Sequence, residues 1–323
     1  MFTNVTVVGG GVLGSQIGLM AAYTGHNVTF WLRSEGSIGR TQPRLEHYSA
    51  EMTKALEQAK ALIGNPMGAY LYAKGLITDW KNATAESISK LEEEWQVNQK
   101  KNIHISLDMA EALKDADIVI ESMTEDPQQK IDVFKKMKDL LPEKAILCTN
   151  SSTLLPSMFA EYTGRPEKFC ALHFANEIWK FNTAEVMGHA GTAKETIEQV
   201  IAFAKDMNMI PLVLHKEQPG YILNSMLVPF LNSAQMLWAK GVADPQTIDL
   251  TWKLATGSPA GPFQIIDIVG LKTCYDIVVM DPSYKDENSV VHKMAEMLKE
   301  KMDRGEGGVM EGKGFYDYTK KKQ

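Results

Sequence analysis

The stretch Val5-Thr6-Val7-Val8-Gly9-Gly10-Gly11-Val12-Leu13-Gly14 lies close to the start of the chain. Its β-branched residues predict a short buried strand that ends in glycines. The segment Gly14 to Tyr23 has the small and apolar side chains of a helix that packs closely on a sheet, and Val28 to Leu32 is typical of a second strand. Strand, glycine turn, helix and strand form a βαβ unit, the element of a parallel sheet.

The glycines of this turn follow the pattern G-x-G-x-x-G. In that pattern Gly9 allows the tight turn, Gly11 lets a pyrophosphate approach the backbone, and Gly14 lets the helix pack on the strand. The free N–H groups and positive end of the helix then face the phosphates. We therefore predict that Gly9, Gly11, Val12, Leu13 and Gly14 bind a dinucleotide; a structural glycine turn without a ligand is the alternative.

The end of the second strand lacks one feature of an NAD site. An acidic residue there binds the ribose 2′-hydroxyl of NAD, but this strand ends Trp31-Leu32-Arg33-Ser34. Arg33 fits a residue that accommodates the 2′-phosphate of NADP, and it fits equally an arginine that stacks on adenine with either cofactor. We expect NAD, with NADP not excluded.

The α/β alternation continues along the chain. Further strands are expected at 103–106, 118–121, 145–148, 169–174 and 210–214, and helices at 108–114, 128–140 and 192–206. Apolar residues at three- and four-residue steps predict a helical arm, about residues 36–102, inserted between two strands. Residues 1–216 are thus predicted to form an α/β domain with a doubly wound parallel sheet, a Rossmann fold.

The pattern changes after Lys216. Helices are expected at 222–240, 245–256, 265–279 and 290–304, with no convincing strand among them. Residues 217–323 are therefore predicted to form an all-helical domain that contributes to the substrate site. Its apolar helices need a partner surface, which favours a homodimer formed through this domain.

Composition excludes several classes of protein. The 323 residues are 44% hydrophobic and 23% charged with a net charge of −6, which argues against a nucleic-acid-binding protein. The three cysteines are far apart, so neither a disulfide framework nor a zinc ribbon is expected. No metal-ligand cluster is evident. The sequence shows neither a signal peptide nor a run long enough to span a membrane, so a cytoplasmic protein is expected.

A histidine and a glutamate suggest proton transfer. His173 ends an apolar strand, where doubly wound folds place ligands, and Glu185 follows it in Thr183-Ala184-Glu185-Val186-Met187. A carboxylate that reaches a histidine orients its ring and stabilises the imidazolium, as the oxidation of an alcohol requires. From spacing alone, an ordinary half-buried histidine is the alternative.

These residues resemble the L-3-hydroxyacyl-CoA dehydrogenase family, along nearly the whole chain. Besides the glycine fingerprint, the similar segments are Asp117 to Lys130, Thr149 to Leu154, Leu172 to Asn176, Pro219 to Asn224, Gly261 to Leu271 and Gly314 to Tyr316. Several motifs in the right order are far more specific than one. The resemblance implies an oxidoreductase of fatty acid metabolism that moves a hydride between a nicotinamide cofactor and C3 of a 3-hydroxyacyl-CoA or 3-oxoacyl-CoA.

The resemblance also implies a role for each matching residue. His173 is the acid/base, and Glu185 is its partner. Ser152 and Asn224 hydrogen-bond the C3 oxygen or the thioester region of the substrate, and Asn176 helps to position that end. Glu125 and Lys130 contact the nicotinamide half of the cofactor, and Asn150 is grouped with the cofactor contacts.

Structural alternatives exist for most of these residues. Asn150 and Ser152 can form a side-chain turn that caps the next helix. The amide of Asn224 can satisfy helix backbone. Glu125 and Lys130 can form a charge pair in the first turn of a helix without any ligand.

Two departures from the family pattern bear on the substrate. After Asn176 the family has proline and a mostly apolar stretch, whereas this chain reads Glu177-Ile178-Trp179-Lys180-Phe181-Asn182. The arm is also longer than usual, and we assign no coenzyme A contact in it. A dehydrogenase of the same fold that acts on a CoA-free hydroxyl substrate, such as a sugar acid or a carnitine-like alcohol, is therefore the alternative function. A non-catalytic NAD(P)-binding protein is the second.

Overall fold

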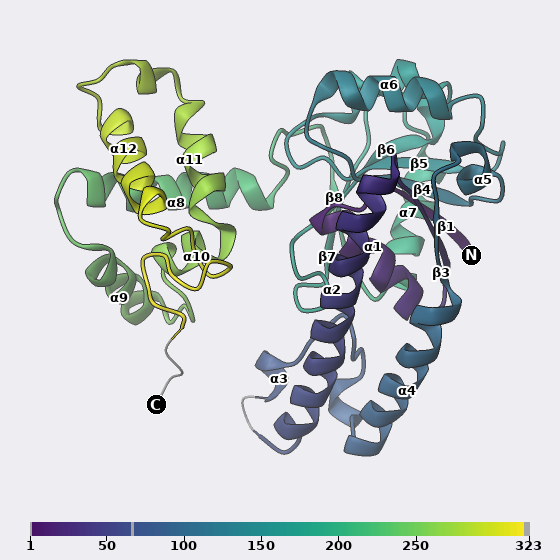
Figure 1. The fold of residues 1–323 in the computed structure, drawn as a ribbon, viewed down its shortest axis with the longest axis horizontal. Coiled ribbons are helices and arrows are strands. Elements are labelled where there is room, and N and C mark those ends of the chain that lie inside the picture. Colours follow the sequence, from purple (N-terminus) through teal and green to yellow (C-terminus); the bar gives the residue numbers. More distant parts are fainter. Residues whose placement is uncertain (1, 66–67, 320–323) are drawn as a thin grey trace. The chain divides into compact units, whose positions relative to one another are not determined.

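The computed structural model describes residues 2–65 and 68–319, which form two compact units, one ending at Ile222 and the other beginning at Leu223. Figure 1 labels the helices and strands of both units. Among the described residues, none of the helices combines the length and the apolar character needed to cross a bilayer.

One mixed sheet organises the first unit. Its strands are β1 (Asn4–Val8), β2 (Asn27–Trp31), β3 (Ile103–Ser106), β4 (Ile118–Glu121), β5 (Ile146–Thr149), β6 (Phe169–Phe174), β7 (Thr183–Met187) and β8 (Ile210–Leu214). They lie in the order β3-β2-β1-β4-β5-β6-β7-β8. All neighbours are parallel except β6 and β7, which are antiparallel. The predicted doubly wound α/β fold is confirmed, but the prediction of a wholly parallel sheet, without a strand at 183–187, was wrong.

Helices cover both faces of this sheet. They are α1 (Val12–Tyr23), α5 (Met109–Leu113), α6 (Pro127–Met137) and α7 (Lys194–Asp206). Strand β4 shows the division, because Ile118 and Ile120 join one apolar core with α1 and α7, whereas Val119 joins the other core with α5 and α6. Strands buried on both faces read as continuous apolar runs, as β4 and β5 do.

The two central strands β1 and β4 end at the glycine turn. β1 pairs with β2 on one side and with β4 on the other, so the connections leave the sheet in opposite directions at this point. Doubly wound sheets bind ligands in the crevice outside the carboxyl ends of such strands. The N–H of Gly9 donates to the carbonyl of Trp31 at 3.1 Å, which holds the turn against the end of β2.

The helical arm is an antiparallel pair of helices that projects beyond the edge of the sheet (Figure 1). It contains α2 (Glu35–Leu62), α3 (Gly68–Leu71) and α4 (Ala85–Lys101). Met52 and Leu56 of α2 and Trp95 of α4 are fully buried and belong to the same core as α1. The arm therefore extends the core of the sheet.

The second unit is helical in its described residues. It contains α8 (Leu223–Ala239), α9 (Pro245–Thr256), α10 (Pro262–Val269), α11 (Leu271–Val279) and α12 (Val290–Asp303). Sequence predicted one helix at 265–279, but Gly270 has a φ of 93° and separates α10 from α11. Asp267 accepts the backbone N–H groups of Phe315 and Tyr316, which fixes the C-terminal segment onto α10.

Candidate active site

His173 and Glu185 form a buried pair on neighbouring strands. β6 and β7 are antiparallel, and their register places the two residues directly opposite each other. Nδ1 of His173 lies 2.9 Å from Oε2 of Glu185. Each residue is 4% exposed. The other carboxylate oxygen, Oε1, accepts the backbone N–H of Ile222 at 2.9 Å, so Glu185 is itself held in place.

Two further contacts orient the imidazole of His173. The ring of Tyr221 stacks on it with centroids 4.4 Å apart. A carboxylate accepts hydrogen bonds, so Nδ1 carries the hydrogen and Nε2 is the basic atom of the neutral ring. Nε2 faces Oγ of Ser152 at 3.2 Å. The atom predicted to exchange a proton is thus next to the serine predicted to bind the reacting oxygen.

Glu125 anchors the turn that presents Ser152. Its Oε1 accepts the backbone N–H groups of Ser152 and Thr153, each at 2.9 Å, and the hydroxyl of Ser151. Burial acts to raise the pKa of Glu125, but the hydrogen bonds from Ser151 and Thr153 and the charge of Lys130 outweigh burial and leave this pKa below its ordinary value. The carboxylate is therefore ionised and holds the turn at neutral pH.

A buried ion pair lies beneath this turn. Nζ of Lys130 is 2.7 Å from Oε1 of Glu121, and the two side chains are 1% and 0% exposed. The second oxygen of Glu121 accepts the hydroxyl of Thr149 at 2.7 Å. Lys130 also lies 3.5 Å from Glu125, so one cation links both carboxylates. Removing one partner of such a pair leaves an uncompensated buried charge.

Glu121 was not identified as a site residue from sequence. It was quoted as part of a family motif without a role. The signal available was a charged residue at the end of a strand buried on both faces, nine positions before a lysine in the first turn of the next helix. A charge at such a position needs a partner, because burying it alone is very costly.

Asn150 ties three strand ends together. Its Oδ1 accepts the N–H of Phe174 at 3.1 Å, and its Nδ2 donates to Oγ of Ser122 at 3.1 Å. Asn150 thereby connects the ends of β4, β5 and β6, next to His173. Asn176 is exposed just after β6.

The segment that departs from the family pattern is fixed in place. The N–H of Glu177 donates at 2.8 Å to Oε1 of Gln16, a buried residue of α1, and Glu177 has a φ of 57°. Trp179 is buried, and its carbonyl accepts the N–H of Gly75 in the arm at 2.9 Å. The exposed side of the segment has an ion pair between Lys180 and Glu177 at 2.8 Å. The segment between β6 and β7 is therefore held against α1 and the arm.

The glycine turn has the shape of a pyrophosphate cradle. Gly9 has a φ of 110°, and a Cβ there would lie 2.7 Å from the carbonyl oxygen of Ser122; a Cβ on Gly14 would lie 2.3 Å from the carbonyl oxygen of Gly9. A Cβ on Gly11 would meet nothing closer than 4.0 Å, so the space above this residue is open. These residues fit a dinucleotide, since its phosphates can approach Gly11 and the start of α1. Val12 and Leu13 form the first turn of that helix, and Val12 is exposed.

Two further predicted residues, Arg33 and Asn224, belong to other elements of the chain. Arg33 is exposed immediately after β2 and Leu32. Asn224 lies in the first turn of α8, in the second unit, and is partly exposed. The first unit thus brings together Ser152, His173 and Glu185.

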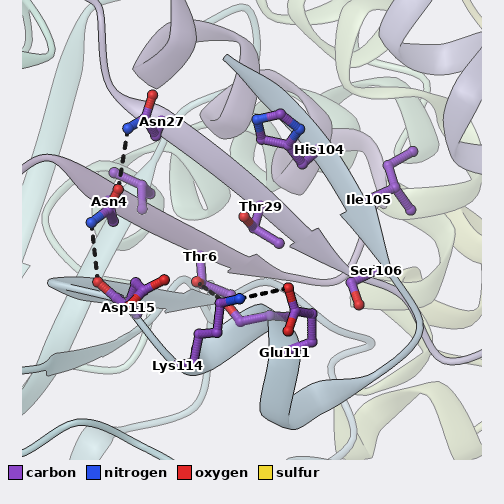
Figure 2. Close-up of a pocket in the computed structure, with 13 residues that line it drawn as sticks. Asn4, Thr6, Asn27, Thr29, His104, Ile105, Ser106, Glu111, Lys114 and Asp115 are labelled. Carbon is purple, nitrogen blue, oxygen red and sulfur yellow. Dashed lines mark hydrogen bonds and ion pairs between the residues drawn. The ribbon is translucent and has the colours of Figure 1, made fainter. Parts of the chain in front are cut away.

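A separate pocket of about 500 Å³ opens over β1, β2, β3 and α5 (Figure 2). Some of its polar groups bind one another, as Lys114 does with Glu111 and Asn4 with the carbonyl of Asp115. None of the predicted site residues lines it. The residues predicted to transfer a proton therefore do not belong to this pocket.

Comparison with known proteins identifies the family. Residues 4–218 match the 3-hydroxyacyl-CoA dehydrogenase, NAD binding domain, and residues 220–318 match the 3-hydroxyacyl-CoA dehydrogenase, C-terminal domain. The chain belongs to the 3-hydroxyacyl-CoA dehydrogenase family. Its N-terminal domain is an NAD-binding domain, as the glycine turn predicted.

Individual relatives cover nearly the whole chain. Human mitochondrial hydroxyacyl-coenzyme A dehydrogenase is 30% identical over 316 residues, which cover 98% of this chain and 91% of that protein. The 3-hydroxybutyryl-CoA dehydrogenase of Clostridioides difficile is 30% identical over 317 residues, which cover 98% and 100%. The solved structure of a diketoreductase that acts on dicarbonyl compounds is 41% identical, with a TM-score of 0.78 and coverage of 98% and 99%.

Proposed function

We propose that this protein interconverts 3-hydroxyacyl-CoA and 3-oxoacyl-CoA, with His173 as the acid/base. The observation that carries the proposal is the pair of His173 and Glu185, with Nε2 of the ring directed at Ser152. Membership of the family supports an acyl-CoA substrate, since the relatives at 30% identity carry that name.

The side chains of this protein carry out the proton transfer of the reaction. The nicotinamide, when bound, accepts or provides the hydride. In the direction of oxidation, Nε2 of His173 takes the hydroxyl proton as hydride leaves C3, and Glu185 stabilises the imidazolium that forms. In the direction of reduction, the imidazolium returns that proton to the oxygen on C3. Holding both reactants in one geometry replaces a bimolecular encounter, which supplies much of the rate.

The other residues position the reacting groups. We propose that the hydroxyl of Ser152 donates to the oxygen on C3, because it lies beside Nε2 of His173. Asn176 and Asn224 are proposed to hold the thioester end of the substrate. Glu125, Lys130 and Asn150 shape the floor of the nicotinamide pocket, and they do so through the turn that carries Ser152.

A second candidate is the reduction of a CoA-free dicarbonyl compound. The diketoreductase shares 41% identity with this chain, more than the acyl-CoA dehydrogenases quoted above. The segment from Glu177 to Asn182 also departs from the family pattern and borders the end of β6. A 1,3-dicarbonyl compound and a 3-oxoacyl thioester present the same reacting ketone, so His173 serves either substrate.

One set of assays separates the two candidates. Oxidation of NADH, and separately of NADPH, is followed with acetoacetyl-CoA and with ethyl acetoacetate, which has the same oxo group without coenzyme A. The proposal expects a far higher kcat/KM for acetoacetyl-CoA. A higher kcat/KM for the ester would replace it with the second candidate. Turnover of neither substrate, in protein that binds the cofactor, would reject both.

We further propose that the second unit forms a homodimer. Several apolar residues of α8 and α9 are exposed, among them Met226, Leu250 and Leu254 at 63%, 54% and 77%. Large exposed apolar patches mark interaction sites. Analytical ultracentrifugation should find a dimer for the wild-type protein and a monomer for Leu254→Glu. A wild-type monomer at micromolar concentration would reject the proposal.

A further inference from the structure

The turn between β2 and α2 has positively charged side chains at the place where an NAD site has a carboxylate. The residue that follows β2 is Leu32, which is 2% exposed and cannot bind a ribose hydroxyl. Three arginines follow it before residue 45, at positions 33, 40 and 44, with Glu35 as the one acidic residue between them. The net charge of this short segment is therefore positive.

The start of α2 packs directly against the glycine turn. The hydroxyl of Thr41 and Nη1 of Arg44 both donate to the carbonyl of Gly10, at 3.1 and 3.2 Å. A Cβ on Gly10 would lie 2.2 Å from Oγ1 of Thr41, so the contact leaves no space between them. Thr41 and Arg44 thus fix the start of α2 against the turn that is predicted to receive the dinucleotide.

Ser34, Ser37 and Arg40 form one polar cluster at the beginning of α2. The hydroxyls of Ser34 and Ser37 are 3.1 Å apart, and Nη2 of Arg40 donates to Oγ of Ser37 at 3.2 Å. Because residues three and four apart share a helix face, Ser37, Arg40 and Arg44 lie on the same side of α2. Arg33 precedes the cluster, and no described residue accepts a hydrogen bond or ion pair from its side chain.

We propose that this cluster binds the 2′-phosphate of NADP(H), so that the protein favours the phosphorylated cofactor over NAD(H). In doubly wound folds the adenine ribose lies at the end of β2, where an acidic residue selects the free hydroxyl and an arginine accommodates the phosphate. Guanidinium groups and hydroxyls are strong donors to phosphate oxygens, and guanidinium can bind two of them at once. Arg33 and Arg40 supply the charge, and Ser34 and Ser37 supply hydroxyl donors.

Glu35 supports a competing interpretation. It lies in the first turn of α2, three residues after Leu32, and its carboxylate is exposed. If Glu35 accepted the ribose hydroxyls, the protein would select NAD(H). The two interpretations make opposite predictions for a nucleotide with and without the 2′-phosphate.

Direct binding of 2′,5′-ADP and 5′-ADP, measured by isothermal titration calorimetry, tests the proposal without substrate or turnover. We expect 2′,5′-ADP to bind at least about tenfold tighter to the wild-type protein, the effect of a hydrogen-bonded charge pair. Arg33→Gln and Arg40→Gln should each remove most of that difference and leave the affinity for 5′-ADP unchanged. The difference should also shrink as salt is added, since both arginines are exposed.

Two further variants complete the experiment. Lys54→Gln removes a charge from an exposed part of α2, about 15 Å further along the helix from Arg44, and should change neither affinity. Glu35→Gln should leave 5′-ADP binding unchanged. Equal affinities for the two nucleotides, tighter binding of 5′-ADP, or a loss of 5′-ADP binding in Glu35→Gln would each overturn the proposal.

The inference rests on the proposed function only because it names the cofactor form used at the same site. The inference and the proposed reaction can be rejected independently of each other. Selective binding of 2′,5′-ADP without turnover of acetoacetyl-CoA would leave the inference standing and reject the proposed reaction. Turnover of acetoacetyl-CoA together with equal binding of the two nucleotides would do the reverse.

Discussion

Oε1 of Glu125 accepts the backbone N–H of Ser152 at 2.9 Å, so the acidic residue that follows β4 holds the serine that faces His173. The family resemblance assigned Glu125 to the nicotinamide half of the cofactor. In the structure Oε1 binds the donors of the serine turn, while Oε2 is the oxygen that faces Lys130. Glu125 therefore has a positioning role that does not depend on a bound cofactor.

Glu125→Gln should slow turnover because it weakens the turn that holds Ser152. An amide accepts fewer and weaker hydrogen bonds than a carboxylate, so the turn loosens and kcat falls about tenfold. Asp244→Asn is the matched control, because Asp244 likewise accepts a backbone N–H, that of Thr247 at the start of α9 in the second unit. Steady-state kinetics of both variants should show the loss in kcat only for Glu125→Gln. Equal losses would mean a general effect on folding.

The same variant has a predicted pH dependence. The pKa of Glu125 lies below its ordinary value of 4.5, so its contribution to stability is complete above pH 4.5 and is lost as the pH falls through the lower value of the folded state. The side chain is 36% exposed, so solvent screening limits this contribution to about 1 kcal/mol. Urea unfolding should show wild type more stable than Glu125→Gln at pH 7, with a difference that shrinks below pH 4.5. A difference that grows towards acid would contradict this account.

Most of the fold could be predicted from the first strand and turn. The apolar runs of β1, β4 and β6 are continuous because both faces of each strand are buried, and such runs are visible in the sequence. β7 was missed because the charged side chain of Glu185 interrupts its apolar run. The break at Gly270 was missed because α10 and α11 have similar apolar periodicity on both sides of it.

The sequence was sufficient to predict candidate residues whose side-chain type suggests a chemical role. It was not sufficient to predict the contacts that depend on how strands and helices pair in the fold. His173 and Glu185 were paired from their roles, and the antiparallel register of β6 and β7 supplies the geometry. Glu121 was passed over although its partner Lys130 is only nine residues away. The support at Gln16 escaped notice because its partner, the backbone of Glu177, is distant in sequence. Such pairs become visible only when the fold brings them together.

His173→Gln should reduce kcat by about 100-fold to 10,000-fold, because the reaction loses its acid/base. The Kd of NADH, measured by fluorescence titration, should be unchanged. Glu185→Gln should lower kcat about 100-fold or more, since an amide cannot stabilise the imidazolium and can donate to Nδ1. Glu217→Gln is the control for loss of a carboxylate, because Glu217 accepts the backbone N–H of Ser157 at 2.7 Å. Full activity in His173→Gln would reject the proposed mechanism.

Gly11→Ala should separate cofactor binding from folding. The backbone of Gly11 has a φ of −69°, which alanine adopts freely, and its Cβ would enter open space. Stability should therefore stay unchanged, while nucleotide affinity falls at least about tenfold because the methyl group occupies the path of the pyrophosphate. Gly39→Ala, in the exposed part of α2, should instead raise stability by about 0.5–1 kcal/mol and leave affinity unchanged. Unchanged nucleotide affinity in Gly11→Ala would show that the cradle lies elsewhere.

Gln16→Leu tests whether the segment after β6 determines the substrate. Oε1 of Gln16 accepts the N–H of Glu177 at 2.8 Å, and leucine would remove the acceptor of that partly buried donor at a cost of about 1 kcal/mol. The left-handed backbone of Glu177 should then relax, so the KM for the acyl substrate should rise while the Kd of the cofactor stays constant. Thr196→Val is the matched control, since it removes a hydrogen bond from Thr196 of α7 to the carbonyl of Glu167. If Gln16→Leu and Thr196→Val changed stability alike and neither changed KM, the segment would be structural and substrate choice would lie elsewhere.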